Sequence, residues 1–223
     1  MKSIMEMVQQ RHLQPGDRLP SERDLAERLG IGRNAVREGI AALTTLRVLE
    51  SRPNSGIYLR RVSTDSSFET LVALAEQGGS PTAGEIGEST EVRLALESLA
   101  ARLACDRRSE DDLASMADIL QRTERLLREG GNIAELDTEF HIALVTASHN
   151  SVLVRVLNSF YCLSAPRRRA WFENHEQGKS SARDHRRMAR AIEDRNAEDA
   201  QRLIQQHMRR AQDYWAEVLG CRR

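Results

Sequence analysis

Four side chains in the second half of the sequence have the types and spacing of a metal site. Asp137 and His141 are four residues apart in a helix-like segment, so both would emerge from one helical face. His185 and His207 lie on two later segments of helical pattern and could converge on that face in a bundle. One carboxylate and three imidazoles suit Zn²⁺, Mn²⁺, Fe²⁺ or Ni²⁺. By pattern alone, surface or hydrogen-bonded histidines would explain the same residues.

A second candidate site, for DNA, lies in the first 61 residues. Arg33 stands at the start of an expected helix, where a recognition helix meets base edges, and Asn34 and Arg37 project from its exposed face. Arginine is the commonest specific reader of guanine, because its fork matches O6 and N7 together. Arg23, near the start of the preceding helix, could reach a phosphate or the same groove.

A short hairpin after these helices supplies further candidate DNA contacts. Two β-favouring runs, 48–49 and 57–59, flank the turn-forming letters PNSG, which predicts the wing of a winged helix. Small or basic residues suit close approach to the DNA backbone or minor groove. The wing candidates are Arg52, Asn54, Ser55 and Gly56. The alternative is that the arginines only solvate a helical domain that never contacts DNA.

The elements that would hold the DNA site form a helix-turn-helix pattern. A first helix over residues 3–12 is ended by the turn formers of LQPGDRLP. Ser21, with Asp24 three residues on, begins a second helix that stops at Gly30. The third helix begins near Arg33, and its expected buried stripe is Val36, Ile40 and Leu43.

The rest of the chain is helical by pattern, so the fold class is mainly α: a winged helix-turn-helix, then an antiparallel bundle of six to seven helices. The expected domains are residues 1–61, a linker at 62–67, and 68–223. Expected helices span about 68–77, 86–106, 109–129, 132–147, 150–172, 180–194 and 196–219. Expected caps are Asn132, Asn150 and Ser180, with helix ends at Gly130, Gly131 and Gly178 and a kink or end at Pro166.

Composition and charge limit the class of protein. The 223 residues carry 33 Lys and Arg against 33 Asp and Glu, but residues 1–61 hold eleven against seven, a net of +4. A basic module joined to an acidic one predicts a polyanion partner for the first. No apolar run reaches the roughly 18 residues that span a bilayer, and the start has no secretory segment. Three scattered cysteines predict reduced thiols in the cytoplasm. The lack of a long apolar run excludes membrane proteins, and the cysteine pattern excludes disulfide scaffolds and zinc fingers.

The N-terminal motifs carry a family resemblance. The stretch PGDRLPSERDLAERLG, followed by RNAVRE and the wing glycine, resembles the winged helix of GntR-family bacterial transcription regulators. By that resemblance, Arg23, Arg33 and Arg37 occupy DNA-contacting positions and Gly56 closes the wing. Gly32 stands where many relatives carry Ser or Thr, and Arg47 replaces a frequent Gly. These departures leave open which half-site sequence the protein recognises, but they do not affect the expected fold.

The second half is similar to the ligand domain of the FadR-like branch, the FCD domain. The similarity rests on EVRLALESLAARLA, DTEFHIAL, SHNSVL and the spacing of the last two histidines. Metal-binding members use one Asp and three His, which implies Asp137, His141, His185 and His207, with zinc the ion expected in the isolated protein. His12, His149 and His175 match no family ligand.

The same resemblance implies an effector and a function. Arg93 matches the arginine that meets an effector carboxylate, and Asn150 is a weaker candidate that is equally explained as a helix cap. We expect a homodimeric repressor that binds a near-palindromic double-stranded operator and responds to a small organic acid. A metal-dependent enzyme and a ligand-independent architectural DNA-binding protein are the alternatives. No HExxH motif or other acid–base pair supports the enzyme.

Overall fold

The computed structural model describes residues 1–60, 68, 71–72, 75 and 83–218. The chain divides into two compact units, Met1–Pro81 and Thr82–Arg223. The expected linker at 62–67 and most of the expected helix at 68–77 lie outside the described residues. The expected domain boundary therefore stays a prediction.

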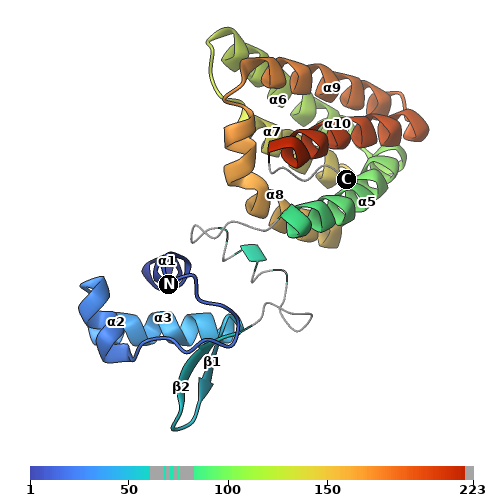
Figure 1. Cartoon of the computed structure of the whole chain (residues 1–223). Helices are drawn as coiled ribbons and strands as arrows, with labels where there is room; N and C mark the ends of the chain where they lie inside the picture. Colours follow the sequence, from blue (N-terminus) through green and yellow to red (C-terminus); the bar gives the residue numbers. More distant parts are fainter. Residues whose placement is uncertain (61–67, 69–70, 73–74, 76–82, 219–223) are drawn as a thin grey trace. The chain divides into compact units, whose positions relative to one another are not determined.

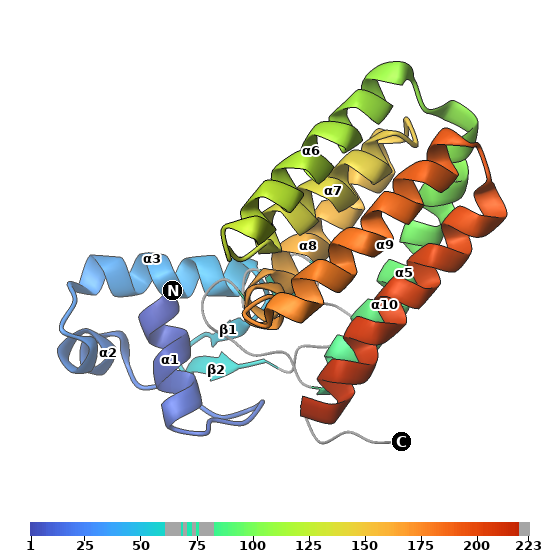
Figure 2. The same cartoon turned by 90° about the horizontal axis from the view of Figure 1, so that it is seen from above.

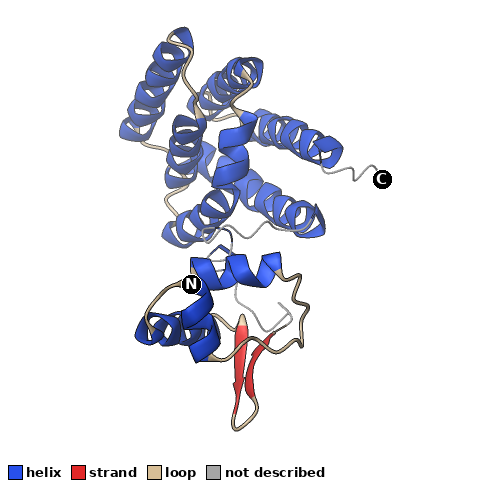
Figure 3. Ribbon diagram, turned by 60° about the vertical axis from the view of Figure 1, so that its left-hand side comes forward, coloured by secondary structure: helices blue, strands red, loops and turns tan. Residues whose placement is uncertain are grey.

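Residues 1–60 form three helices and a two-stranded hairpin, which confirms the expected winged helix. The elements are α1 (Lys2–Gln10), α2 (Glu22–Leu29), α3 (Arg33–Thr45), β1 (Leu49–Arg52) and β2 (Gly56–Leu59). The strands pair antiparallel, with Leu49 opposite Leu59 and Arg52 opposite Gly56. Figure 3 shows the strands as a narrow hairpin that extends away from the helices.

Local chemistry sets the ends of these elements. The side chain of Ser21 accepts a hydrogen bond from the Asp24 amide, which satisfies a free N–H at the start of α2. Gly30 ends α2 in the left-handed conformation, at φ 65°. Gly56 has φ +129°, and a Cβ there would lie 2.7 Å from Nε of Arg18. Only glycine fits this corner of the wing.

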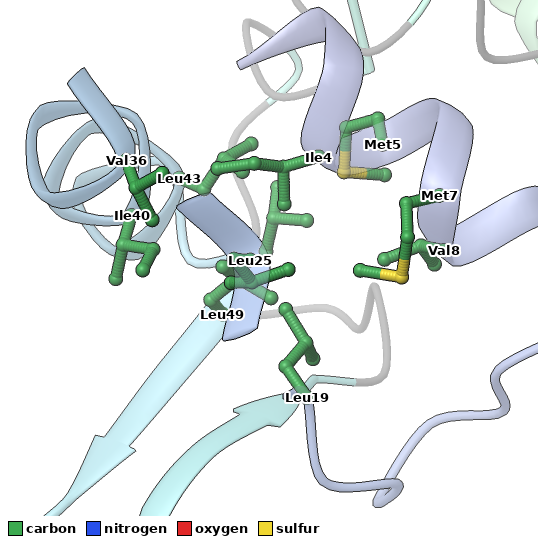
Figure 4. Packing of buried hydrophobic residues seen from close by; sticks show 11 residues of the cluster. Ile4, Met5, Met7, Val8, Leu19, Leu25, Val36, Ile40, Leu43 and Leu49 are labelled. Atoms are coloured by element: carbon green, nitrogen blue, oxygen red, sulfur yellow. The ribbon is translucent and has the colours of Figure 1, made fainter. Parts of the chain in front are cut away.

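Apolar side chains from all three helices and the first strand fill the core of this unit. Leu25 of α2 and Leu43 of α3 are fully buried, together with Ile4 of α1 and Leu49 of β1. Figure 4 shows these side chains pointing toward one another from their separate elements. The expected stripe of α3, which is Val36, Ile40 and Leu43, is buried here. Burying that face leaves the opposite face of α3 to solvent.

The described part of the C-terminal unit consists of six helices. They are α5 (Ala83–Arg107), α6 (Glu110–Arg128), α7 (Ala134–Thr146), α8 (Ser151–Trp171), α9 (His175–Glu193) and α10 (Ala197–Val218). Figures 1 and 2 show α10 running beside α5, while α9 packs against α6 and α10 and α7 packs against α6 and α8. No helix in the described ranges is long and apolar enough to cross a membrane.

Two expectations about α8 and α9 were wrong. Helix α9 begins at His175, not near residue 180, because the side chain of Asn174 caps it by accepting from the Glu176 amide at 3.0 Å. Ser180 and Gly178 therefore lie inside α9, and Gly178 packs against Leu127 of α6. Pro166 lies within α8, so the expected helix end at this residue was wrong, whereas a kink there stays a prediction.

Two arginines tie the α5–α6 turn to the α9–α10 turn. Arg195 donates from Nη1 to the carbonyls of Cys105 at 2.8 Å and Asp106 at 2.9 Å. Arg108 donates from Nη2 to the carbonyl of Glu193 at 2.9 Å. We call these contacts the arginine clasp. They satisfy helix-end carbonyls that have no partner within their own helix.

Candidate functional site

The four residues predicted as metal ligands meet inside the C-terminal unit. One ligand atom from each of Asp137, His141, His185 and His207 lies within 4.8 Å of the other three. The three imidazole centroids are 5.1–5.2 Å apart. Asp137 and His141 are one turn apart on α7, while the other two come from α9 and α10. The bundle therefore brings together residues that are up to 70 positions apart in the sequence.

The carboxylate of Asp137 is held in its ionised form. Ser181 donates to its Oδ1 at 2.9 Å, and Nε of Arg168 lies 3.4 Å from its Oδ2. Burial by itself would raise the pKa of Asp137, but the neighbouring imidazoles and Arg168 outweigh it and lower the pKa to about 2. An ionised carboxylate is the form that binds a metal.

The environment of His185 and His207 favours the neutral imidazole, which is the metal-binding form. Burial lowers the pKa of His185 well below its ordinary value, and the ring stacks on Phe140 at 4.1 Å between centroids. Burial also lowers the pKa of His207. Nδ1 of His207 lies 3.3 Å from Oδ2 of Asp184, a contact that orients the ring and leaves Nε2 for another partner.

His141 provides an independent test of whether the residues fit a metal. Its side chain is fully buried, and Nε2 has no hydrogen-bond partner among the described residues, while Nδ1 faces the carboxylate of Glu97. A buried polar nitrogen without a partner costs about 1–3 kcal/mol. A metal ion bound to Nε2 would remove that cost. The donor set, one oxygen and three nitrogens, fits a borderline divalent ion such as zinc without distinguishing it from manganese, iron or nickel.

A buried carboxylate that the sequence did not single out lies beside this histidine. Oε2 of Glu97 is 3.0 Å from Nδ1 of His141, and Oε1 accepts from Arg93 at 2.6 Å and from Tyr161 at 3.1 Å. Burial opposes ionisation of Glu97, but Arg93 and His141 together lower its pKa well below the ordinary value. The signal was present in the sequence, since Arg93 and Glu97 are four residues apart on one helix.

A cavity opens directly onto this cluster of possible metal ligands. Its empty volume, including the solvent-open mouth, is about 750 Å³, and Asp137 and His207 form part of its wall. Residues of α5, α7, α8, α9 and α10 line it. The guanidinium-bearing side chains in the wall are Arg93, Arg167, Arg168 and Arg210. Four guanidinium groups in one wall make the cavity suited to an anion.

Aromatic side chains form the apolar part of this wall. Trp171, Phe172 and Trp215 all line the cavity. They also belong to an apolar cluster around Ile133. They thus pack in the interior on one side and bound the cavity on the other.

The two predicted effector residues lie in different places. Arg93 lines the cavity, as expected. Asn150 caps α8 by accepting from the amides of Val152 at 3.2 Å and Leu153 at 3.1 Å. It borders a separate hollow at the other end of α8. The geometry accounts for Asn150 as a helix cap.

The predicted DNA-contacting side chains lie on the surface of the N-terminal unit. Arg23, Arg33, Asn34 and Arg37 are exposed at the starts of α2 and α3. The guanidinium of Arg37 makes an ion pair with Glu22 at 3.2 Å. In the wing, Arg52, Asn54 and Ser55 are exposed, Gly56 is half-buried, and Arg52 lies over the Tyr58 ring at 4.2 Å.

Comparison with known families assigns both units of the chain. Residues 1–59 match the model of the bacterial regulatory proteins of the gntR family. Residues 88–210 match the model of the FCD domain, and this match covers more than half of the chain.

Comparison with individual proteins agrees with these matches. The chain is 29% identical over 212 residues to the HTH-type transcriptional regulator LutR of Bacillus subtilis, covering 93% of this chain and 95% of LutR. It is 24% identical to the transcriptional repressor NanR of Klebsiella aerogenes, covering 96% and 83%. The solved structure of Lar, described as controlling the agr system of Listeria monocytogenes, is similar at a TM-score of 0.71 and 17% identity, covering 97% and 95%.

Proposed function

Because the chain belongs to the GntR family of bacterial regulators and carries an FCD domain, we propose that it is a repressor controlled by a small carboxylate. Transcription regulation, rather than catalysis, is the function of its relatives LutR and NanR. The carboxylate would bind at a divalent-metal site in the C-terminal unit and change operator affinity. The repressing direction is supported by NanR, a named repressor.

One observation carries this proposal: Asp137 and His207 belong both to the metal set and to the wall of an arginine-lined cavity. A ligand in that cavity would meet the metal and Arg93 at once. When bound, the metal would supply a Lewis-acidic centre that attracts a carboxylate oxygen. Arg93 would bind and orient the other end of the acid.

The protein's own residues hold the metal set in place and exclude unsuitable ligands. Ser181 and Arg168 fix the carboxylate of Asp137, and Asp184 fixes the ring of His207. Long acyl chains are disfavoured, because burying an apolar tail beside unpaired polar groups costs free energy.

At the operator, we propose that Arg33 and Arg37 read bases and that Arg23 binds the phosphate backbone. Asn34 is a further candidate for base contact, and the wing residues Arg52, Asn54, Ser55 and Gly56 would approach the backbone or minor groove. To contact DNA, the Arg37 side chain must leave Glu22. That exchange is inexpensive, because Arg37 is 70% exposed and an exposed ion pair contributes at most about 1 kcal/mol.

We propose that the active form is a homodimer on a near-palindromic operator. A single winged helix covers too small a site for high specificity, whereas a two-fold protein matches two half-sites. The C-terminal unit exposes apolar side chains on two helices that contact each other, α5 and α8. They are Val92, Leu99, Val152 and Val156, of which Val152 is 65% exposed. Such a face would be covered in a self-complementary interface.

A binding screen tests the proposed function. Zinc-loaded protein is tested with small mono- and dicarboxylates for thermal stabilisation and for release from an operator selected from a random duplex library. We expect at least one acid to stabilise the protein and to change DNA affinity by about 1–3 kcal/mol. His185→Ala should abolish the response, whereas His149→Gln, at an exposed histidine outside the metal set, should retain it. No response to any acid would contradict the proposal.

A further inference from the structure

The four arginines of the cavity wall differ in whether the protein already neutralises them. Arg93 makes an ion pair with Glu97, Arg168 with Asp137, and Arg210 with Asp184. Each of these arginines therefore has a carboxylate of its own. Arg167 makes no hydrogen bond or ion pair with any residue in the described ranges.

The position of Arg167 makes this lack of a partner costly. Its side chain is half-buried in the cavity wall on α8, one turn before Trp171. Burial, and then repulsion by the nearby Arg93, lowers its pKa. A partly desolvated cation beside another cation is unfavourable until an anion neutralises it. An anion would therefore stabilise the cavity wall more beside Arg167 than beside the other three arginines.

We propose that Arg167 binds a second anionic group of the effector, so that the effector is a short dicarboxylate rather than a monocarboxylate. This inference rests on the proposed function, since one carboxylate of the acid occupies the metal end of the cavity. The second carboxylate then lies toward Arg167 and Arg93. Arg167 is thus the residue that determines specificity between acids with one and with two charges.

Charge balance supports two carboxylates rather than one. Around the cavity, four arginines face Asp137, Glu97 and Asp184, which leaves one positive charge from the protein before a divalent ion is counted. A monocarboxylate at the metal would leave Arg167 unneutralised. The chain that joins the two carboxylates would lie against the apolar wall of Trp171, Phe172 and Trp215. That apolar wall suits a linking chain of a few methylene groups better than a linking chain that carries several hydroxyl groups.

Matched pairs of acids test the inference. L-malate differs from L-lactate only by a carboxylate in place of one terminal hydrogen, and 2-hydroxyglutarate differs from 2-hydroxybutyrate in the same way. Each acid is titrated calorimetrically into full-length, zinc-loaded protein. In at least one pair, the wild type should bind the dicarboxylate at least about tenfold more tightly than the monocarboxylate. The reason is that the second carboxylate forms a hydrogen-bonded charge pair with Arg167.

Substitutions on α8 test whether Arg167 causes the preference for dicarboxylates. Arg167→Gln should lose most of the ratio between the two affinities, and Arg167→Lys should keep part of it. The control is Arg169→Gln, which removes an exposed arginine that pairs with Glu135 outside the cavity wall and should keep the wild-type ratio. Zinc content and thermal unfolding show that each variant is folded and loaded.

The outcomes separate this inference from the proposed function. Equal affinity within both pairs would overturn the inference while the carboxylate-responsive regulator stands. A preference for dicarboxylates that survives in Arg167→Gln would remove Arg167 from the recognition of the second group. Failure of all four acids to bind would overturn the inference, and the proposed function would fall with it only if the full screen of carboxylates also gave no response. Loss of the preference in Arg167→Gln alone would support it.

Discussion

Oε2 of Glu97 lies 3.0 Å from Nδ1 of His141, and the two fully buried side chains come from different helices, α5 and α7. The other oxygen of the same carboxylate accepts a hydrogen bond from Arg93, whose side chain lines the cavity. A buried carboxylate on Nδ1 favours the tautomer in which Nε2 carries the lone pair. Glu97 thus connects a cavity arginine to a metal ligand through contacts of 3.0 Å or less.

Replacement of Glu97 should therefore weaken metal binding although Glu97 is not a ligand. We expect Glu97→Gln to lower zinc affinity by about 10- to 100-fold, because the amide orients the His141 ring less strongly and leaves Arg93 unpaired. Competition with a chromophoric chelator measures the change. Glu91→Gln, at an exposed position on the same helix, is the control. Equal affinities in the two variants would show that Glu97 does not support the site.

Metal removal should lower the thermal stability of the C-terminal unit. A ligand that binds only the folded state stabilises it, so chelation by EDTA should reduce the Tm of the wild type. A protein with both His141→Ala and His207→Ala should unfold at a Tm that no longer responds to chelator. Elemental analysis after gel filtration gives the metal content. Retention of metal by this double variant would refute the site.

The metal-free protein should lose stability as the pH falls below the ordinary histidine pKa. Burial lowers the pKa of His185 and His207 in the folded state, so the unfolded chain binds more protons in this range. Stability is therefore fully present above about pH 6.5 and decreases as acidity increases toward the lowered folded values. Urea unfolding in EDTA between about pH 7.5 and 5.5 measures the slope, in a range above ordinary carboxyl titration. His185→Gln should flatten it, and an unchanged slope would contradict this assignment.

Base reading by α3 predicts a sequence-dependent loss of affinity. Arg37→Ala should cost about 1–3 kcal/mol on the selected operator and should relax its sequence preference. Arg28→Ala, which removes an exposed arginine from the last turn of α2, should have a smaller effect. Fluorescence anisotropy at two salt concentrations separates base reading from phosphate binding. If Arg37→Ala weakens operator and random DNA equally, the side chain binds phosphate only.

The exposed valines of α5 and α8 predict where copies of the chain associate. Val152→Asp should shift the protein toward monomer, because a charge placed in an apolar interface must be desolvated. Asn158→Asp adds the same charge elsewhere on α8 and should leave association unchanged. Sedimentation velocity at micromolar concentration gives the mass. A wild type that is monomeric with and without DNA would refute the dimer.

Sequence patterns predicted the winged helix, and the family resemblance implied the four residues that the structure brings together as a candidate metal site. Spacing of four residues placed Asp137 and His141 on one face, and glycine and capping signals marked the ends of α2. The remaining residues of the site depend on packing between distant helices. Arg168 reaches Asp137 across α7 and α8, and nothing in its local sequence indicates that contact.

Errors at helix ends had a similar cause. Residues 174–180 contain two residues that can cap a helix, and local propensity does not choose between Asn174 and Ser180. In the folded protein Asn174 caps α9, and Gly178 in its first turn packs against Leu127 of α6. Such tertiary contacts override local signals.

The arginine clasp fixes one end of α5 to the α9–α10 turn. Arg195 and Arg108 join one end of α5 to the α9–α10 turn, whereas the cavity residues Ile86, Thr90 and Arg93 lie near its other end. At 1.5 Å per residue these two regions of α5 are roughly 20 Å apart. A small rotation about the clasp would therefore act as a lever, with its largest displacement at the start of α5. That is also the end of α5 nearest in sequence to the DNA-binding unit.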